Sequence, residues 1–292
     1  AMLSAPIIEE SGNKMGLTPE NKTFLNYWFR HIWEYTWPLY PGLILTSAIF
    51  SIPIYRIVLA QLPLTLSAIL AGCIFGLSRL PYKPSSRERK GKVIKEICNF
   101  LLNAWPILTI IFFVLVLKWE LILSLTITVL LTLVTTKIKR GRVLSILKNS
   151  LSWRTILLII SVMVFKRVLE ASGVLLVVSE VFNHTGISPL IVMFPIPLFV
   201  GLLTGVSQAF VGITFPILLP FIGTNDPNLT YVMLAYAGGF TGILLSPVHL
   251  CLIVTKDYFK ADFARVYKSL LLPAIFVVLV AFTIVFVQSF SS

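Results

Sequence analysis

The stretch from residue 190 to 258 most constrains the fold, because it is strongly apolar yet interrupted twice by small and polar residues. At membrane depth, non-helical backbone is tolerated only where it is buried in protein or faces a wet cavity. Two such interruptions in neighbouring segments are typical of a transporter substrate site. The interruptions are Thr204-Gly205-Val206-Ser207-Gln208 and Gly238-Gly239-Phe240-Thr241-Gly242, the latter followed by Ser246-Pro247-Val248-His249.

The composition predicts an integral membrane protein. Of its 292 residues, 57% are hydrophobic and 12% are charged, whereas a soluble domain has about 25% charged residues. The net charge of +12 comes largely from short basic loops between apolar runs, which argues against nucleic-acid binding. By the positive-inside rule, we expect loops 81–96 and 137–153 to be cytoplasmic in a multi-pass protein of the plasma membrane.

Apolar runs of suitable length predict an all-α, polytopic transmembrane protein. Residues 9–22 are polar and are expected to form a loop, with Thr18 and Pro19 at the start of a helix. Residues 24–35 mix aromatic and charged side chains, which favours either a helix at the membrane interface or the first turns of the next span. The predicted spans are 38–57, 62–80, 97–117, 120–136, 154–170, 229–255 and 270–290.

Residues 190–222 are predicted to form a re-entrant hairpin. Its arms, 190–204 and 209–221, are each about 20 Å long as helices, shorter than a hydrocarbon core of ~30 Å. Two short arms that meet at a Gly-Ser-Gln tip would enter and leave the bilayer on one side. The alternative is one kinked span followed by a loop. Residues 229–255 are expected to form a discontinuous helix.

A weak internal repeat divides the chain. Residues 2–8 and 244–250 each contain a small residue and a proline in an apolar run. Each is followed by a polar patch, a segment mixing aromatic and charged residues, and a proline that opens a span. We therefore expect two repeats, inverted if they follow carrier architecture, with the first truncated. The expected division is a first-repeat remnant (1–80), a basic-flanked helical hairpin (81–153) and a second repeat (154–292). Counting spans places both mixed segments on the same side, which leaves the inversion open.

The tip of the hairpin is the first candidate binding site. Ser207 and Gln208 come at the start of a helix, where unpaired N–H groups and the helix dipole suit a carboxylate. Gly205 would let backbone approach a ligand, and Thr204 would add a hydroxyl. The alternative is that Ser207 only caps the helix, with no ligand.

The second interruption supplies the other half of the candidate site. Gly238, Gly239 and Gly242, with Thr241, would allow the helix to unwind and expose carbonyls to Na⁺, or would only let helices pack closely. Ser246, Pro247 and His249 follow as further substrate-binding candidates. His249 could couple proton movement, or be a neutral, hydrogen-bonded packing residue. The remaining charged candidates, Lys166, Arg167 and Glu170, have the spacing of structural ion pairs.

No catalytic or metal-binding pattern is present in the sequence. The three cysteines have no paired spacing, which argues against a disulfide framework and a Cys-rich metal site, and indicates packing residues. The three histidines, His31, His184 and His249, lie in unrelated segments. We expect neither an enzyme nor a bound cofactor, apart from Na⁺ as a coupling ion. A phosphate-binding loop is also missing, which disfavours an ATP-driven pump.

Several runs resemble the membrane-protein family known as domain of unknown function 401: FLNYWFRHIWEY (24–35), WPLYPG (37–42), FKRVLEASG (165–173), GVSQAF (205–210) and SPVHLC (246–251). That family is similar to the ion-transporter superfamily of gluconate, citrate, dicarboxylate and tripartite-type carriers. The resemblance implies two inverted repeats, each with a re-entrant hairpin and a broken helix that hold an organic anion and often Na⁺. A Pro-Met-Pro-Gly-Gly run expected before Met2 is missing, in keeping with truncation.

Together these patterns predict a secondary carrier for a small organic anion, driven by Na⁺ or H⁺ and working by alternating access. Its partners would be the anion and the lipid bilayer, with a homodimer as a further option. Two alternatives stay open. One is a non-transporting membrane fragment or subunit. The other is a membrane-embedded enzyme, which would need ionisable residues clustered at one depth.

Overall fold

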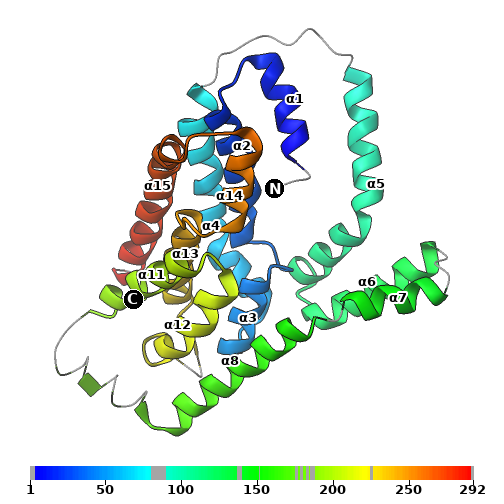
Figure 1. Cartoon of the computed structure of the whole chain (residues 1–292). Helices are drawn as coiled ribbons and strands as arrows, with labels where there is room; N and C mark the ends of the chain where they lie inside the picture. Colours follow the sequence, from blue (N-terminus) through cyan, green and yellow to red (C-terminus); the bar gives the residue numbers. More distant parts are fainter. Residues whose placement is uncertain are drawn as a thin grey trace.

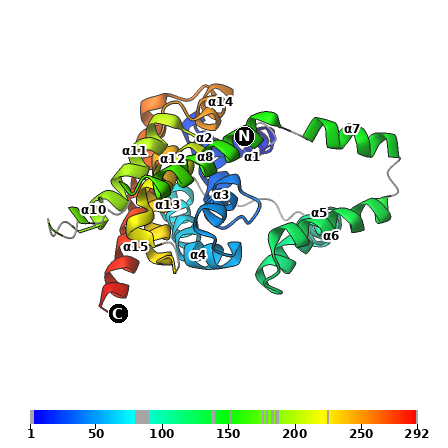
Figure 2. The same ribbon diagram turned by 90° about the horizontal axis from the view of Figure 1, so that it is seen from below.

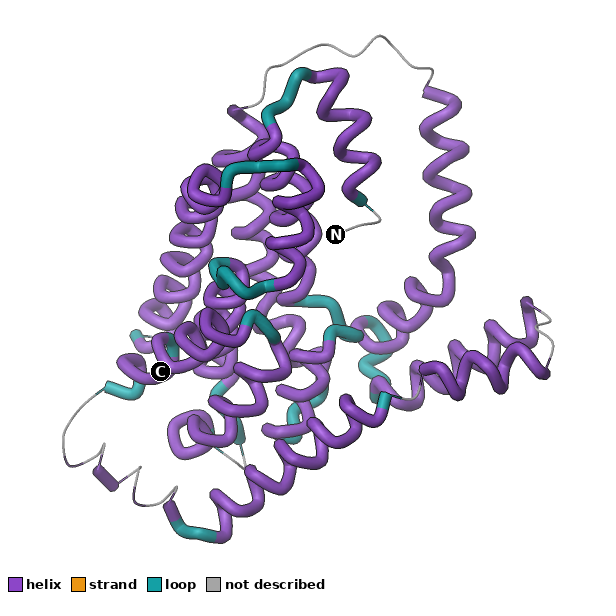
Figure 3. Tube along the Cα trace, viewed as in Figure 1, coloured by secondary structure: helices purple, strands orange, loops and turns teal. Residues whose placement is uncertain are grey.

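The computed structural model describes residues 4–79, 90–136, 140–150, 152–174, 177, 180–181, 184, 188–223 and 226–290. Every regular element among these residues is a helix, which confirms the all-α prediction (Figure 3). Two stretches in this part are long and apolar enough to cross a bilayer, Ile54–Gly76 with 23 residues and Phe263–Ser289 with 27. Together with the composition, they fit a helical membrane protein.

The N-terminal region is more helical than its polar sequence suggested. Helix α1 (Ala5–Met15) extends through residues that were predicted to form a loop, and it ends at Gly16 with a left-handed φ of 70°. The exposed pair Lys14–Glu10, 2.8 Å apart at i,i+4, supports the helix and lowers the pKa of Glu10. Helix α2 (Pro19–His31) begins as predicted, because the Thr18 hydroxyl accepts a hydrogen bond from the backbone N–H of Asn21.

Helix α2 packs in the core, and both alternatives for its place in the bilayer, an interfacial helix or the first turns of a span, stay predictions. Tyr27, Trp28 and, in the following 3₁₀ turn η1 (Ile32–Tyr35), Tyr35 are at most 1% exposed. Their polar ends are compatible with burial because two of them reach distant backbone carbonyls. The indole N–H of Trp28 donates to Ala68 at 2.9 Å, and the Tyr27 hydroxyl donates to Leu244 at 3.1 Å.

The first two predicted spans are divided differently in the structure. Helix α3 (Pro41–Phe50) is short and ends at Ser51, whose φ of 55° is left-handed. Pro53 follows, and helix α4 (Ile54–Ala71) starts directly after it. Helix α4 then continues into a π-helical segment, η2 (Gly72–Gly76), and a 3₁₀ turn, η3 (Leu77–Arg79). The spans 38–57 and 62–80 are therefore wrong, because the break falls at residues 51–53.

The middle of the chain forms the predicted helical hairpin. Helices α5 (Lys90–Leu115) and α6 (Leu121–Thr136) pack against each other and turn near Lys118, with helix α7 (Arg140–Ser150) next in the chain. Figures 1 and 2 show these three helices to one side of the main bundle. Helix α8 (Trp153–Ala171) returns to the bundle and packs on α3 and α12. Residues 81–89 of the first basic loop, and residues 137–139 and 151 of the second, lie outside the described residues.

The C-terminal part contains the centre of the core. Its helices are α10 (Leu190–Met193), α11 (Pro195–Thr204), α12 (Ser207–Ile222), α13 (Leu229–Leu244), α14 (Leu250–Phe259) and α15 (Phe263–Ser289). Every residue of α13 from Val232 onward is buried. Helices α4, α11, α12 and α15 surround it. A short-armed helix pair and a broken helix are thus present where the sequence predicted them.

Candidate functional site

The hairpin tip and the helix break meet in the structure. Helix α11 ends because Gly205 adopts a left-handed φ of 63°, and α12 begins two residues later at Ser207. From the break, the Ser246 hydroxyl donates to the carbonyl of Leu202 at 2.7 Å. The imidazole Nδ1 of His249 lies 2.7 Å from the carbonyl oxygen of Gly205. These two hydrogen bonds hold residues 246–249 against the hairpin tip. The two predicted halves of the candidate site therefore lie next to each other.

The helix does not break at the glycines. Gly238, Gly239 and Gly242 all lie inside the continuous helix α13, and the interruption falls at residues 245–249, after the helix ends. A Cβ at Gly242 would overlap the carbonyl oxygen of Leu198, and one at Gly238 would overlap that of Phe194. The predicted unwinding is therefore wrong. Gly238 and Gly242 instead allow α11 to approach the backbone of α13 closely, and Gly239 leaves room for the Phe210 ring of α12.

The other predicted residues differ in how they face the site. Ser207 is buried at the start of α12, and its hydroxyl lies 3.2 Å from the Gln208 side-chain oxygen. Thr204 donates its hydroxyl to its own helix at Val200, 2.7 Å away. Thr241 is buried within α13, whereas Pro247 is exposed. Ser207 and Gln208 therefore remain the predicted residues best placed at a helix N-terminus.

Helix α12 begins with unpaired backbone donors. The first hydrogen bonds of the helix run from Ala209 and Phe210 to the carbonyl of Val206. Among the described residues, the N–H groups of Ser207 and Gln208 find no acceptor. Such groups, at the positive end of the helix dipole, suit a carboxylate or another anion.

The end of α2 and the following turn η1 contribute ionisable side chains to the site that sequence reasoning missed. His31 Nε2 lies 3.2 Å from His249 Nε2, although 218 residues separate the two histidines. One guanidinium nitrogen of Arg30 donates to the sulfur of Cys251 at 3.3 Å. The carboxylate of Glu34 is 3.9 Å from His31 Nε2. The one available signal in the sequence was the spacing of Arg30, His31 and Glu34 within a strongly aromatic helix.

Backbone contacts determine the tautomer of both histidines. Nδ1 of His31 lies 2.6 Å from the carbonyl oxygen of Tyr27, just as Nδ1 of His249 faces Gly205. A carbonyl oxygen only accepts hydrogen bonds, so both Nδ1 atoms carry hydrogen. In the neutral rings, both Nε2 atoms therefore present lone pairs to each other. Facing lone pairs repel each other, so a separation of 3.2 Å favours a proton or another cation between the two nitrogens.

A pocket of about 350 Å³ opens beside this cluster. Arg30 and Glu34 line it together with Trp33, Trp37 and Tyr40. The pocket thus combines a guanidinium with aromatic walls, which are features that suit a small organic anion.

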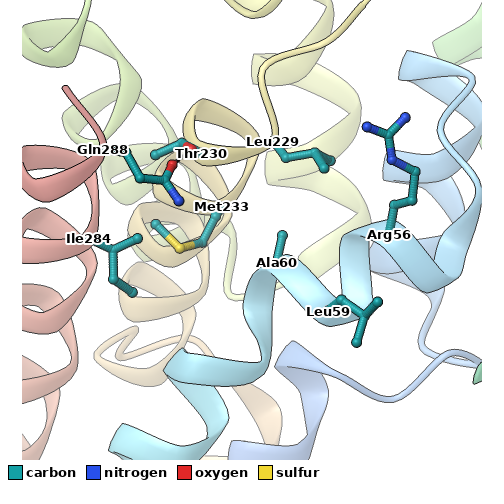
Figure 4. Close-up of a pocket in the computed structure, with 8 residues that line it drawn as sticks. All are labelled: Arg56, Leu59, Ala60, Leu229, Thr230, Met233, Ile284 and Gln288. Carbon is teal, nitrogen blue, oxygen red and sulfur yellow. Dashed lines mark hydrogen bonds between the residues drawn. The ribbon is translucent and has the colours of Figure 1, made fainter. Parts of the chain in front are cut away.

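A second pocket, of about 390 Å³, lies at the opposite end of α13 (Figure 4). Its wall is mostly aliphatic, with Arg56 on one side and the hydrogen-bonded pair Thr230 and Gln288 on the other. Helix α13 has 16 residues, so its two ends are about 24 Å apart. This pocket is therefore separate from the histidine cluster.

The charged candidates in α8 form the structural pairs that their spacing indicated. Glu170 lies 3.8 Å from Lys166 and 3.2 Å from Arg167. The Lys166 ammonium also donates to the carbonyl of Ile49, which ties α8 to the end of α3. These residues explain packing and do not extend the candidate site.

Comparison with known proteins gives one finding. Residues 1–287 match the family described as "Protein of unknown function (DUF401)". No curated protein matches the chain.

Proposed function

Because the chain belongs to the DUF401 family, whose function is unknown, we propose from its own residues that it is a secondary carrier for a small organic anion. The anion would bind between the N-terminus of α12 and the pocket lined by Arg30 and Tyr40. The carrier would be a multi-pass protein of the plasma membrane with basic loops in the cytoplasm. The coupling ion would be Na⁺ or H⁺.

One observation carries this proposal. The hairpin tip at Gly205 and the helix break at His249 are joined directly, beside unpaired N–H groups at Ser207 and Gln208. Discontinuous helices whose N-terminal ends point at an anion are a recurring design of secondary carriers. A re-entrant path of α11 and α12 through the bilayer, and similarity to the ion-transporter superfamily, belong to the same proposal.

The pairing of two helix–turn–helix units is a further support for repeats. Helices α1 and α2 pack against α14 and α15, and each pair is divided by a capped break, at Thr18 and at Asp262. Tyr258 donates its hydroxyl to Glu9 at 2.7 Å, which raises the pKa of the tyrosine. The backbone N–H of Asp262 donates to Glu20 at 3.3 Å. The proposed division into a first repeat (1–80) and a second repeat (154–292), and their inversion, rest on this correspondence between α1–α2 and α14–α15.

Uptake into proteoliposomes tests the transport proposal. The purified chain would be reconstituted and offered a panel of radiolabelled mono-, di- and tricarboxylates under a Na⁺ gradient, a pH gradient, or neither. We expect gradient-dependent uptake of at least one anion. Gln208→Ala and Ser207→Ala should reduce it by about 5- to 30-fold, since each removes a polar group worth ~1–2 kcal/mol at the binding site.

The control for these variants is Ser161→Ala on α8. Ser161 is exposed and donates only to its own helix at Leu157, so its removal should leave uptake unchanged. If Ser207→Ala and Gln208→Ala transported as well as Ser161→Ala, the side chains of Ser207 and Gln208 would not bind the anion. If no carboxylate accumulated under either gradient, the carrier proposal would be wrong.

A membrane-embedded enzyme is the second candidate, because one specific observation favours it. Such an enzyme needs a cluster of ionisable residues. The fold brings five such residues together: Arg30, His31, Glu34, His249 and Cys251. A thiol near imidazole and guanidinium groups is a plausible nucleophile. Full uptake by a Cys251→Ser variant would exclude thiol chemistry from transport. Loss of a hydrolytic activity in the same variant would favour the enzyme.

A further inference from the structure

The histidine pair has the organisation of metal ligands. Each ring is held by a hydrogen bond from Nδ1–H to a backbone carbonyl, at Tyr27 for His31 and at Gly205 for His249. Metal-binding histidines are oriented in this way, with one nitrogen anchored and the other free for the metal. The free Nε2 atoms lie 3.2 Å apart with lone pairs facing. Two nitrogens bound to one tetrahedral Zn²⁺ lie about 3.3 Å apart.

Cys251 provides a third ligand atom. Its sulfur and one ring nitrogen of each histidine all lie within 4.8 Å of one another. The Arg30 guanidinium donates to this sulfur at 3.3 Å and so favours the thiolate, which is the form that binds metals. The thiolate also balances part of the charge that a divalent ion would bring.

Glu34 is suited to be the fourth ligand. One of its oxygens is 3.9 Å from His31 Nε2, and the other is buried with no hydrogen-bond partner in the described part of the chain. A buried carboxylate oxygen without a partner is costly unless a proton or metal ion satisfies it. Glu34 also lines the pocket of about 350 Å³, which gives an ion access to the cluster.

We propose that His31, His249 and Cys251 bind a zinc ion, with Glu34 completing the site. Two imidazoles, a thiolate and a carboxylate suit Zn²⁺, whereas Mg²⁺ and Ca²⁺ prefer oxygen ligands alone. The ion would join α2 to the start of α14, and through the His249–Gly205 bond it would hold the hairpin tip in place. The proposal is independent of whether the protein transports an anion.

Zinc titration of the purified, chelator-treated full chain tests the proposal. A chromogenic chelator would compete for ZnCl₂, and thermal unfolding would be followed in parallel. We expect one Zn²⁺ per chain and a melting temperature that rises with Zn²⁺ concentration. His249→Gln and Cys251→Ser should weaken binding by roughly 100-fold or more, because they remove ligands rather than supporting residues. His184→Gln, at an exposed histidine in the chain, should bind as the unchanged protein does.

A measurement on the unaltered chain tests the proposal without depending on whether any variant folds. Zn²⁺ should protect Cys251 from alkylation, while the exposed Cys98 stays reactive and serves as an internal control. Co²⁺ in place of Zn²⁺ should show a thiolate-to-metal charge-transfer band. No zinc binding at micromolar concentration, unchanged alkylation of Cys251, or full binding by Cys251→Ser would each overturn the proposal. A proton shared between the rings would then be the cation of the site.

Discussion

Replacing Gly201 with alanine is expected to destabilise the protein by about 1–3 kcal/mol, the usual cost of overpacking a filled core. Gly201 lies in α11 where this helix packs against α13, and a Cβ there would overlap the carbonyl oxygen of Gly239. Backbone cannot rotate away as a flexible side chain can, so the two helices must separate. The melting temperature in detergent, followed by circular dichroism, measures the effect.

Gly141→Ala is the matched control for this substitution. Gly141 lies in helix α7, and a Cβ there would meet no atom within 4 Å. Alanine at an unobstructed helix position should stabilise by about 0.5–1 kcal/mol, because it restricts the unfolded chain. The two variants should therefore shift the melting temperature in opposite directions. Equal shifts would mean that α11 and α13 are not in backbone contact at Gly201.

The closeness of these two helices also bears on the site. Helix α11 leads directly into Gly205, whose carbonyl holds His249. If α11 moves away from α13, the tip moves with it. Gly201→Ala should then reduce uptake and zinc binding even though it lies outside the cluster, whereas Gly141→Ala should change neither.

Local sequence patterns predicted the elements that depend on local chemistry. The all-α class, the start of α2 at Thr18 and Pro19, and the tip at Gly205 follow from capping and turn residues, which act over a few positions. The α5–α6 hairpin follows from the length of its apolar runs. These features need no knowledge of the rest of the fold.

The errors came from contacts made over long sequence distances. The sequence of α2 does not reveal which groups its aromatic side chains meet, since Tyr27 bonds to a carbonyl 217 residues away. A run of glycines permits either unwinding or close packing, and only the position of α11 decides between them. The histidine cluster was missed for the same reason, since His31 and His249 are 218 residues apart.

Trp28→Ala is expected to have the largest effect of any substitution discussed, a loss of about 3–5 kcal/mol of unfolding free energy. Trp28 is fully buried between α2 and α4, stacks on Phe24 with ring centroids 5.9 Å apart, and donates to Ala68. Alanine would leave a cavity in the centre of the bundle. Trp28→Phe should cost only about 0.5–1.5 kcal/mol beyond packing changes, because it mainly removes one hydrogen bond.

Gly72, the first residue of η2, leaves room for the indole, and it supplies the control for this prediction. A Cβ at Gly72 would lie 2.8 Å from ring atoms of Trp28 and Phe29, so Gly72→Ala should destabilise a chain that retains Trp28. In the Trp28→Ala background one of these obstructions is gone, and the same substitution should cost less. The coupling free energy from this double-mutant cycle should therefore be large, about 0.5–3 kcal/mol. Additive effects would mean that Trp28 does not occupy the space beside Gly72, and the exposed Trp153→Ala should show no coupling to Gly72 at all.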